Sequence, residues 1–404
     1  MIKKISIDDL TPGMYVHDLN CGWMEHPFLT NAFPVDGKAR IAKIRSLGIQ
    51  DLYIDTERGL DVPGAQTLEE VDESLRQKME DIAVGVTEEI PLPPHVSLSE
   101  EAPQSRKIHA EANQIVQRLM HDVRMGAQIE QERVEPLVEE IVDSVLRNQN
   151  ALLPLAALKQ HDTYTFEHSV AVSALMTAFA RHLGMSCQAI REIATGALLH
   201  DLGKMRIPDA ILNKPGRLTP AEFTRIKEHV NHSVSILKGM SGISAVAMQV
   251  VSQHHERHDG SGYPGRLRGN GISMYGKMAA IVDVYDAISS DRVYHKGLQP
   301  SQAMRKLLEW SEYHFEARLV HRFIRAIGIY PTGSLVRLSS GRLAVIREQH
   351  TNNLLHPIVM VIYHTHKMQY LKPEIMDLAN SHDRIVGQEE FSRWKIDPKS
   401  WQPA

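Results

Sequence analysis

The stretch Leu198-Leu199-His200-Asp201-Leu202-Gly203-Lys204 decides the interpretation of this sequence, because it closes an apolar run with two adjacent polar side chains. The run from Ile193 to Leu199 predicts a buried helix that ends here. An imidazole beside a carboxylate is costly to bury unless a partner compensates for both. A metal ion is such a partner, since both groups ligate divalent metals. Taken alone, the pair favours a simpler interpretation, a capped helix end with a C′ glycine, so further ligands must decide.

The composition is that of an ordinary soluble globular protein, and 404 residues are enough for two or three domains. A formal net charge of −4 gives no sign of nucleic-acid binding. The two cysteines, Cys21 and Cys187, are far apart and fit a reducing cytosol. Neither a signal peptide nor a membrane-spanning run is present, so we expect a cytoplasmic protein without a membrane span. Histidine is the outlier, with 22 residues.

Periodicity predicts a mainly α protein with a small mixed α/β domain at its start. Residues 1–65 form this expected regulatory domain, with short strands around the turn Pro12-Gly13 and a helix from Lys38 to Leu47. Residues 66–130 follow as an acidic linker with helices. A helix is expected to start at Thr67, which forms a T-x-x-E capping box with Glu70.

The remaining chain is predicted as a helical bundle over residues 131–330 and a short β-rich appendix over residues 331–404. One helical region is expected from about Ser105 to Asn148, where apolar residues follow i, i+3, i+4 spacing. After Pro331 the pattern changes to period two and predicts three strands. The tail after Asp383 is polar and gives no chemical signal.

Four further helices of the bundle carry side chains that could join His200 and Asp201 on a metal. His229 is expected in mid-helix, and Asp283 lies in an apolar helix, where a carboxylate is expensive to bury without a cation. Each residue alone is more often a satisfied core or surface group. Together they suit two metal ions with one bridging carboxylate. The candidate ligands are His168, His200, Asp201, His229, His254, His255 and Asp283.

This ligand chemistry favours iron, manganese, nickel or zinc over magnesium or copper(I), since it combines imidazole and carboxylate without thiolate. Two such ions ~3.5–4 Å apart can hold a bridging hydroxide and clamp a phosphate. Lys204 could then contact the phosphate or protonate the leaving oxygen. Its spacing is equally compatible with a solvated charge that favours the helix dipole.

The order of these residues resembles the H…HD…D signature of HD-domain phosphohydrolases, and further motifs resemble the HD-GYP subfamily. The likeness covers about residues 150–330, and the region before it resembles a small domain of unknown function that often precedes HD-GYP domains in bacteria. The motifs that carry it are His168, His200-Asp201-Leu202-Gly203-Lys204, Ile207-Pro208 with Asn213-Lys214-Pro215-Gly216, His229, His254-His255-Glu256, His258-Asp259-Gly260-Ser261-Gly262-Tyr263-Pro264, Asp283-Val284-Tyr285-Asp286-Ala287 and Ser290-Asp291-Arg292.

The resemblance implies an HD-type all-α bundle that hydrolyses cyclic di-GMP to linear pGpG and, in some members, on to GMP, through a metal-bridged hydroxide. It places Asp201 between two ions and makes Lys204 the catalytic lysine. One ion would be held by His168, His200, Asp201 and Asp283, and the other by His229, His254 and His255. The implied contacts to guanine or phosphate are Asp286, Arg292 and Lys296. The loop Gly262-Tyr263-Pro264 would contact partner proteins, including diguanylate cyclases or adaptors.

Two departures from the family pattern shape these expectations. Some members bind a third metal through a Glu one turn before the first His, and here that position is Tyr164, so we expect two ions. Members usually carry Lys or Arg where this chain has His295, so one anion contact is either weaker or shifted to Lys296. Arg292 keeps most of the anion recognition.

Two other functions are compatible with the same residues. One is a cyclic di-GMP sensor with slow turnover that signals through protein partners, against which the intact ligand set and Lys204 argue. The other is an HD hydrolase for a dNTP or ppGpp, against which the GYP loop, Asp286 and Arg292 argue. The sequence does not predict the oligomeric state.

Overall fold

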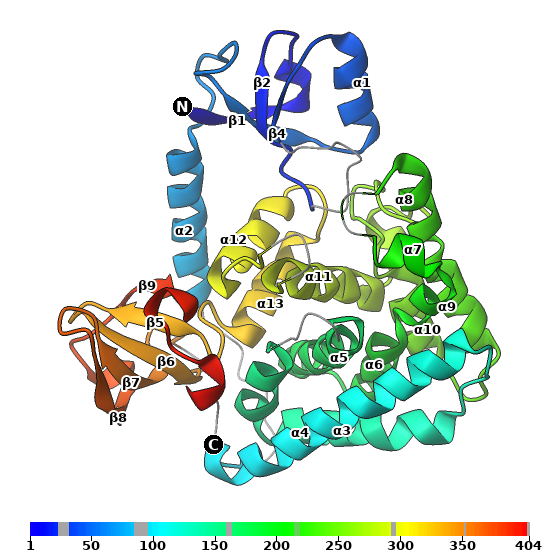
Figure 1. Cartoon of the computed structure of the whole chain (residues 1–404), viewed down its shortest axis with the longest axis vertical. Coiled ribbons are helices and arrows are strands. Elements are labelled where there is room, and N and C mark those ends of the chain that lie inside the picture. The colour runs from blue at the N-terminus through cyan, green and yellow to red at the C-terminus, as the bar shows by residue number, and fades with distance from the viewer. Residues whose placement is uncertain are drawn as a thin grey trace. The chain divides into compact units, whose positions relative to one another are not determined.

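The computed structural model describes residues 1–22, 32–84, 96–158, 164–214, 216, 218–291, 296–350 and 353–401. The chain divides into two compact units (Figure 1). The first comprises Met1–Met79 and Asp209–Lys227, and the second comprises Glu80–Pro208 and Glu228–Ala404. Among the described residues, no helix is both long and apolar enough to cross a membrane.

The first unit is built on a four-stranded antiparallel sheet with the strand order β1-β4-β2-β3. Its core is fully apolar around Val16, Ile44, Leu52 and Ile54. The predicted strands and helix are present, and the short strand β3 was not predicted. The elements are β1 (Ile2–Ser6), β2 (Tyr15–Asp18), β3 (Phe33–Pro34), α1 (Lys38–Ser46), β4 (Asp51–Asp55), α7 (Asp209–Leu212) and α8 (Pro220–Lys227).

Helix α2 (Leu68–Val84) follows this sheet in the chain and begins as the sequence predicts. The amide of Thr67 donates to Glu70 Oε2 at 2.8 Å, and the amide of Glu70 donates to Thr67 Oγ1 at 3.2 Å. The two bonds form the predicted capping box, which satisfies amides that the first turn of a helix leaves unpaired.

The second unit is mainly helical, as predicted. Its helices are α3 (Leu98–Arg124), α4 (Gln131–Ala156), α5 (Tyr164–His182), α6 (Cys187–Leu199), α9 (His229–Lys238), α10 (Ala245–Gln253), α11 (Met274–Ser289), α12 (Pro300–Trp310) and α13 (Ala317–Ile327). The core between them includes the fully buried rings of Phe179 and Phe323, whose centroids lie 5.3 Å apart.

The region from Ser105 to Asn148 is helical as predicted and consists of two helices, α3 and α4, which pack side by side (Figure 1). Helix α3 begins earlier because Ser97 and Glu100 form a capping box. Pro103 obscured this start in the sequence, although it is tolerated inside the helix. The turn between the helices contains Gly126 at a φ of +83°, a conformation that glycine adopts without strain.

Helix α4 contains one residue outside helical geometry, Asn148, with φ −158° and ψ 99°. Its buried side chain serves the backbone around this break. Nδ2 donates to the carbonyl of Val96 at 2.9 Å, and Oδ1 accepts from the amide of Asn150 at 3.0 Å. Because buried backbone groups need partners, the amide of Asn148 stabilises a break that would otherwise be costly.

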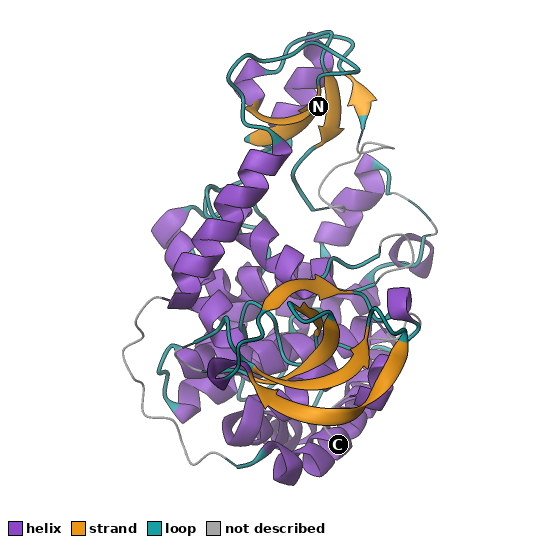
Figure 2. Ribbon diagram, turned by 90° about the vertical axis from the view of Figure 1, so that its left-hand side faces the viewer, coloured by secondary structure: helices purple, strands orange, loops and turns teal. Residues whose placement is uncertain are grey.

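The C-terminal part of the second unit is a five-stranded antiparallel sheet, called here the β module (residues 335–401). Its strands follow the order β8-β7-β6-β5-β9 and curve strongly (Figure 2). Both faces are apolar. One buries Val336 and Ile346, and the other packs Leu335 and Val345 beneath the C-terminal segment. The strands are β5 (Leu335–Leu338), β6 (Arg342–Glu348), β7 (Ile358–His364), β8 (Gln369–Asp377) and β9 (Ile385–Glu389).

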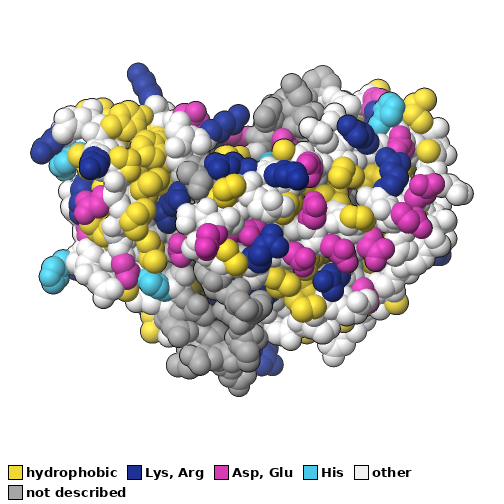
Figure 3. Space-filling model, turned by 90° about the horizontal axis from the view of Figure 1, so that it is seen from below, with side chains coloured by type: hydrophobic (Ala, Val, Ile, Leu, Met, Phe, Trp, Pro, Cys, Tyr) yellow, Lys and Arg dark blue, Asp and Glu magenta, His cyan; other side chains and the backbone are white. Residues whose placement is uncertain are grey.

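The β module also leaves apolar side chains exposed on its outer strands. Figure 3 shows hydrophobic side chains gathered on the left-hand lobe of the molecule, where the β module lies. Strand β8 exposes Tyr370 and Ile375, and β9 exposes Val386. Both edge strands of this sheet therefore expose apolar side chains to solvent, unlike the buried strands at its centre.

Candidate metal centre

All seven predicted ligands lie together in the second unit, at the ends or on the inner faces of five helical segments. The C-terminal ends of two helices deliver four of them. His200 is the C-cap of α6 and is followed by Asp201, and His254 is the C-cap of α10 and is followed by His255. His229 begins α9, which corrects the expectation of a mid-helix position. One turn residue, Glu228, separates α8 from α9.

The carboxylate of Asp201 lies at the centre of this cluster, with its two oxygens on different sides. Oδ2 is 3.5 Å from His168 Nε2 and 3.4 Å from His200 Nε2. Oδ1 is 3.3 Å from His229 Nε2. Asp283 Oδ1 lies on the first side, 3.1 Å from His168 Nε2. The geometry thus presents one carboxylate to two groups of ligands.

Hydrogen bonds fix which nitrogen of several imidazoles faces the cluster. His200 Nδ1 donates to the carbonyl of Ala197 at 2.7 Å, and His254 Nδ1 donates to the carbonyl of Val251 at 2.8 Å. His168 Nδ1 pairs with Asp286 Oδ2 at 2.5 Å. A proton held on Nδ1 leaves the lone pair of Nε2 available, which is how metal-binding histidines are usually oriented.

The cluster contains more nitrogen and oxygen atoms that can accept a hydrogen bond than there are protons to donate to them. His229 Nε2 and His254 Nε2 are only 3.3 Å apart. His200 Nε2 and Asp201 Oδ1 are buried and make no hydrogen bond to any described residue. Three groups each place their ligand atoms within 4.8 Å of one another: His168 with His200 and Asp283, His229 with His254 and His255, and His200 with Asp201 and His254. Such a donor set fits divalent cations.

The excess of acceptors in the cluster also shifts the pKa values of its histidines. Burial lowers the pKa of His200, but the nearby carboxylates of Asp201 and Asp283 outweigh burial and raise it to about 10. Burial, together with neighbouring imidazoles, holds the pKa of His254 well below its usual value. A proton on His200 thus supplies part of the positive charge that the carboxylates attract. Metal ions would supply that charge and compete with the proton.

Lys204 reaches the same cluster from the 3₁₀ turn Leu202–Arg206, which follows Asp201 directly. Its ammonium Nζ donates to Asp201 Oδ2 at 2.5 Å, and its side chain is 17% exposed. Lys204 therefore faces the cluster from its solvent side, where its ammonium can contact both a bound molecule and the carboxylate of Asp201.

Two residues that the sequence analysis did not single out for a role lock this turn in place. Ser233 Oγ donates to the carbonyl of His200 at 2.7 Å and accepts from the amide of Gly203 at 2.8 Å. A Cβ at Gly203 would lie 2.0 Å from the carbonyl oxygen of His229. The absence of a side chain at 203 thus allows the turn to touch α9.

The loop after His255 packs against the cluster from another side. The ring of Tyr263 stacks on His255 with centroids 4.7 Å apart. The buried carboxylate of Glu256 accepts from the amides of Gly265 at 2.6 Å and Leu267 at 2.9 Å. These bonds hold the loop that contains the GYP sequence, and through Tyr263 they orient His255.

The three predicted substrate contacts have different positions. Asp286 is buried behind His168, a contact that the sequence analysis did not predict, and its substrate role stays a prediction. Lys296 pairs with Glu390 of the β module. Arg292 and His295 lie outside the described residues, as does the side chain of Tyr164.

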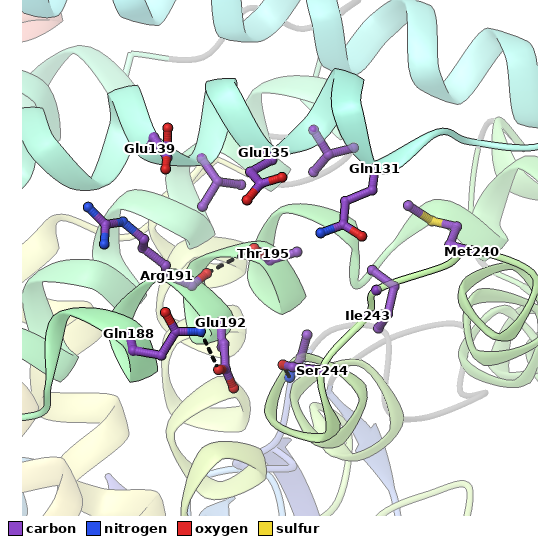
Figure 4. Close-up of a pocket in the computed structure, with 14 residues that line it drawn as sticks. Gln131, Glu135, Glu139, Gln188, Arg191, Glu192, Thr195, Met240, Ile243 and Ser244 are labelled. Carbon is purple, nitrogen blue, oxygen red and sulfur yellow. Dashed lines mark hydrogen bonds between the residues drawn. The ribbon is translucent and has the colours of Figure 1, made fainter.

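A separate small pocket of about 140 Å³ lies between α4, α6 and α10, away from the cluster (Figure 4). Gln188 Nε2 donates to Glu192 Oε1 at 2.7 Å, and Thr195 Oγ1 donates to the carbonyl of Arg191 at 2.9 Å. Glu135 and Glu192 both line it. Its lining contains none of the seven predicted ligands and none of Lys204, Asp286 and Lys296, so this pocket is separate from the candidate site.

Comparison with known proteins matches two stretches of the chain to family models. Residues 150–319 match the family described as "HD domain", and residues 2–134 match "Domain of unknown function (DUF3391)". The chain is 40% identical to "Cyclic di-GMP phosphodiesterase PA4108" of Pseudomonas aeruginosa, covering 98% of this chain and 94% of that protein. Two Vibrio cholerae proteins match a smaller part. "Cyclic di-GMP phosphodiesterase" is 34% identical over 47% of this chain and 44% of its own length. "3'3'-cGAMP-specific phosphodiesterase 2" is 35% identical over 41% of this chain and 32% of its own length.

Proposed function

Since this chain belongs to the HD-GYP family of HD-domain proteins, we propose that it is a phosphodiesterase that hydrolyses cyclic di-GMP. The relative that matches it over nearly the full length is named for this activity. Hydrolysis forms a bond from a water oxygen to phosphorus and breaks the bond to the 3′ oxygen, giving linear pGpG. A second hydrolysis would give GMP.

The position of Asp201 is the observation that carries this proposal. Its two oxygens face two groups of imidazoles, with distances of 3.3 to 3.5 Å to their Nε2 atoms. Asp201 and these histidines are all buried. Asp201 would bridge two ions, with His168, His200 and Asp283 on one and His229, His254 and His255 on the other. Two of the three groups whose ligand atoms lie within 4.8 Å of one another match this division.

We propose iron or manganese as the bound metals, with nickel and zinc as alternatives, because the ligands are imidazoles and carboxylates. Two such ions, when bound, supply a Lewis acid for the phosphate and make water a stronger nucleophile at neutral pH. The protein fixes their ligands in advance through the backbone carbonyls of Ala197 and Val251 and through Asp286.

Lys204 has two candidate tasks in this reaction, and both use its ammonium. It can donate a proton to the leaving 3′ oxygen, or it can stabilise the negative charge that develops on the phosphate oxygens. Its bond to Asp201 Oδ2 keeps the ammonium at the cluster. Asp286, Arg292 and Lys296 are proposed to contact the guanine or phosphate groups. The loop Gly262-Tyr263-Pro264 is proposed to contact a diguanylate cyclase or an adaptor protein.

Replacing Asp201 by Asn tests the proposed activity. We expect turnover of cyclic di-GMP to fall by more than ~100-fold, since even partners behind a ligand are worth ~10–100-fold. Protein prepared without oxygen and supplied with Fe(II) or Mn(II) would be assayed by chromatography of pGpG and GMP. Elemental analysis should find close to two ions in the unmodified protein and fewer in the variant.

The matched control is Asp72→Asn, which removes the same charge from an exposed position on α2. It should leave both turnover and metal content unchanged. If the unmodified protein with bound metal did not hydrolyse cyclic di-GMP, the proposed activity would be wrong. Full turnover by Asp201→Asn would instead exclude the bridging role.

A further inference from the structure

A cavity of about 600 Å³ lies in the second unit between the helical bundle and the β module. On the helical side it is lined by residues of α4 and α11, among them Leu153 and Asp286. On the other side it is lined by residues of the β module, among them Leu335, Glu390 and Phe391. Its lining is mixed, with apolar surface interrupted by charged groups.

Asp286 links this cavity to the back of the candidate metal centre, on the side of His168 that faces away from the cluster; none of the seven predicted ligands lines the cavity itself. One carboxylate oxygen of Asp286 contacts His168 Nδ1 at 2.5 Å, while the residue also lines the cavity. Lys296 lines the same cavity. On the proposed function, two of the residues expected to contact the substrate therefore share a cavity whose opposite wall belongs to the β module.

The end of β9 lies along the segment that carries Lys296. Glu390 Oε2 accepts a hydrogen bond from Lys296 Nζ, and Gln388 Oε1 accepts from the amide of Ser301 at 3.0 Å. The hydrogen bond from Lys296 holds the pKa of Glu390 below its usual value, so this carboxylate is ionised at neutral pH. The side chains of Lys296 and Glu390 are 63% and 40% exposed. An ion pair this exposed is weak and readily separated.

We propose that the β module is part of the substrate-binding site, and that Glu390 sets substrate affinity by competing with a phosphate of the substrate for Lys296. This inference rests on the proposed function, in which Lys296 contacts the substrate. A cyclic dinucleotide carries a negative charge on each of its phosphates. Binding must therefore separate or share the Lys296–Glu390 pair and bring a phosphate near the carboxylate.

The test replaces Glu390 by Gln, which keeps the shape and removes the charge. We expect the KM for cyclic di-GMP to fall ~2- to 5-fold, the equivalent of an exposed ion pair, with kcat unchanged. The difference should shrink as salt is added, because salt screens exposed charges. Glu374→Gln is the matched control, since it removes an exposed carboxylate from β8 of the same module and should leave KM unchanged.

A double-mutant cycle shows whether Lys296 carries the effect. Lys296→Ala should raise KM, and adding Glu390→Gln to it should change KM little. If Glu390→Gln left KM unchanged or raised it, the proposal would be overturned. The same follows if its effect were equally large without Lys296, because Glu390 would then act through another group.

A failure of the proposed function can be told apart from a failure of this inference. Equilibrium binding of cyclic di-GMP would be measured on the same variants, with the Kd in place of KM. If the unmodified protein binds but does not hydrolyse the nucleotide, the proposed function fails and Glu390→Gln still has to lower the Kd. If the protein neither binds nor hydrolyses it, both are wrong.

Discussion

Asp286 illustrates how a single side chain can serve two candidate roles. It follows Asp283 by three residues on α11, so both carboxylates lie on one face of the helix. Asp283 lies among the candidate ligands, and Asp286 lies behind His168 and lines the cavity. A carboxylate behind a histidine ligand orients the ring and makes it a stronger ligand. Contact with His168 and contact with substrate predict different kinetic effects.

Asp286→Asn separates these roles. If Asp286 acts through His168, metal affinity and kcat should fall by ~10–100-fold while KM changes little. The asparagine still accepts a hydrogen bond from His168 but no longer carries the charge. Metal content by elemental analysis and steady-state kinetics at saturating Mn(II) would be measured together. A raised KM with full metal content and normal kcat would identify a substrate contact and refute the orienting role.

The sequence predicts residues of the candidate site better than it predicts their surroundings. The candidate ligands could be picked out because burying an imidazole or carboxylate among apolar residues, as at Asp283, is expensive without a partner. The contacts of Ser233 and Gly203 could not, because neither residue type is unusual on or beside a helix. Their importance depends on how closely the turn after Asp201 approaches α9, which is a property of packing.

Among the elements, the β module contains a buried carboxylate, Asp383, which lies just before β9 and bonds to the turn between β5 and β6. Asp383 accepts from Ser339 Oγ at 2.6 Å, from the amide of Ser340 at 3.0 Å and from Arg342 at 3.1 Å. Burial alone would raise the pKa of Asp383, but these hydrogen bonds outweigh it and lower it to about 2. Because the pKa is depressed on folding, the ionised form stabilises the module.

Asp383→Asn should lower the free energy of unfolding by about 2 kcal/mol at pH 7. The contribution is fully present above the unfolded pKa, near 3.8, and is lost as the pH falls towards the folded value of about 2. Urea unfolding between pH 7 and pH 2 would therefore show the two proteins converging only below about pH 4. Glu374→Gln, on the exposed strand β8, is the control. A difference that persisted unchanged to pH 2 would contradict the assignment to Asp383.

Elements with a clear apolar pattern could be predicted, and largely exposed ones could not. The nearly continuous apolar run of α11 and the apolar pattern of β7 located both, because both elements are largely buried. Strand β8 is largely exposed and contains Pro373, which removes a backbone donor and is tolerated only at a sheet edge or bulge. Strand β9 lies in the tail that gave no signal, since its pairing with β5 depends on distant residues.

At the scale of the whole molecule, the candidate metal centre joins segments that are far apart in the chain. His168 and Asp283 are separated by more than a quarter of the sequence, and the ligands come from helices α5, α6, α9, α10 and α11. Without cations, the close imidazole nitrogens and carboxylates of this centre have too few protons between them. Bound ions would therefore tie these helices together.

Removing the metals should lower the melting temperature of the second unit. A ligand at ~100 times its Kd stabilises the folded state by about 2.7 kcal/mol, which corresponds to a shift on the order of 5 °C. Calorimetry with and without a strong chelator would measure it. The chelator should lower the melting temperature of Asp201→Asn much less. It should lower that of Asp72→Asn by as much as that of the unmodified protein. An unchanged melting temperature after the ions had been removed would contradict the stabilising role.

The break in α4 has a consequence for recognising the same architecture in other sequences. A kink at proline or glycine can be predicted from the sequence. Asn148, by contrast, is an ordinary residue in an apolar helix. Only a side chain with both a donor and an acceptor can serve Val96 and Asn150 at once. A side-chain amide at this position in a homologous chain would therefore indicate a kink in the helix. Aspartate or leucine there would indicate a straighter helix, and the segment before α3, which Asn148 holds through Val96, would be placed differently.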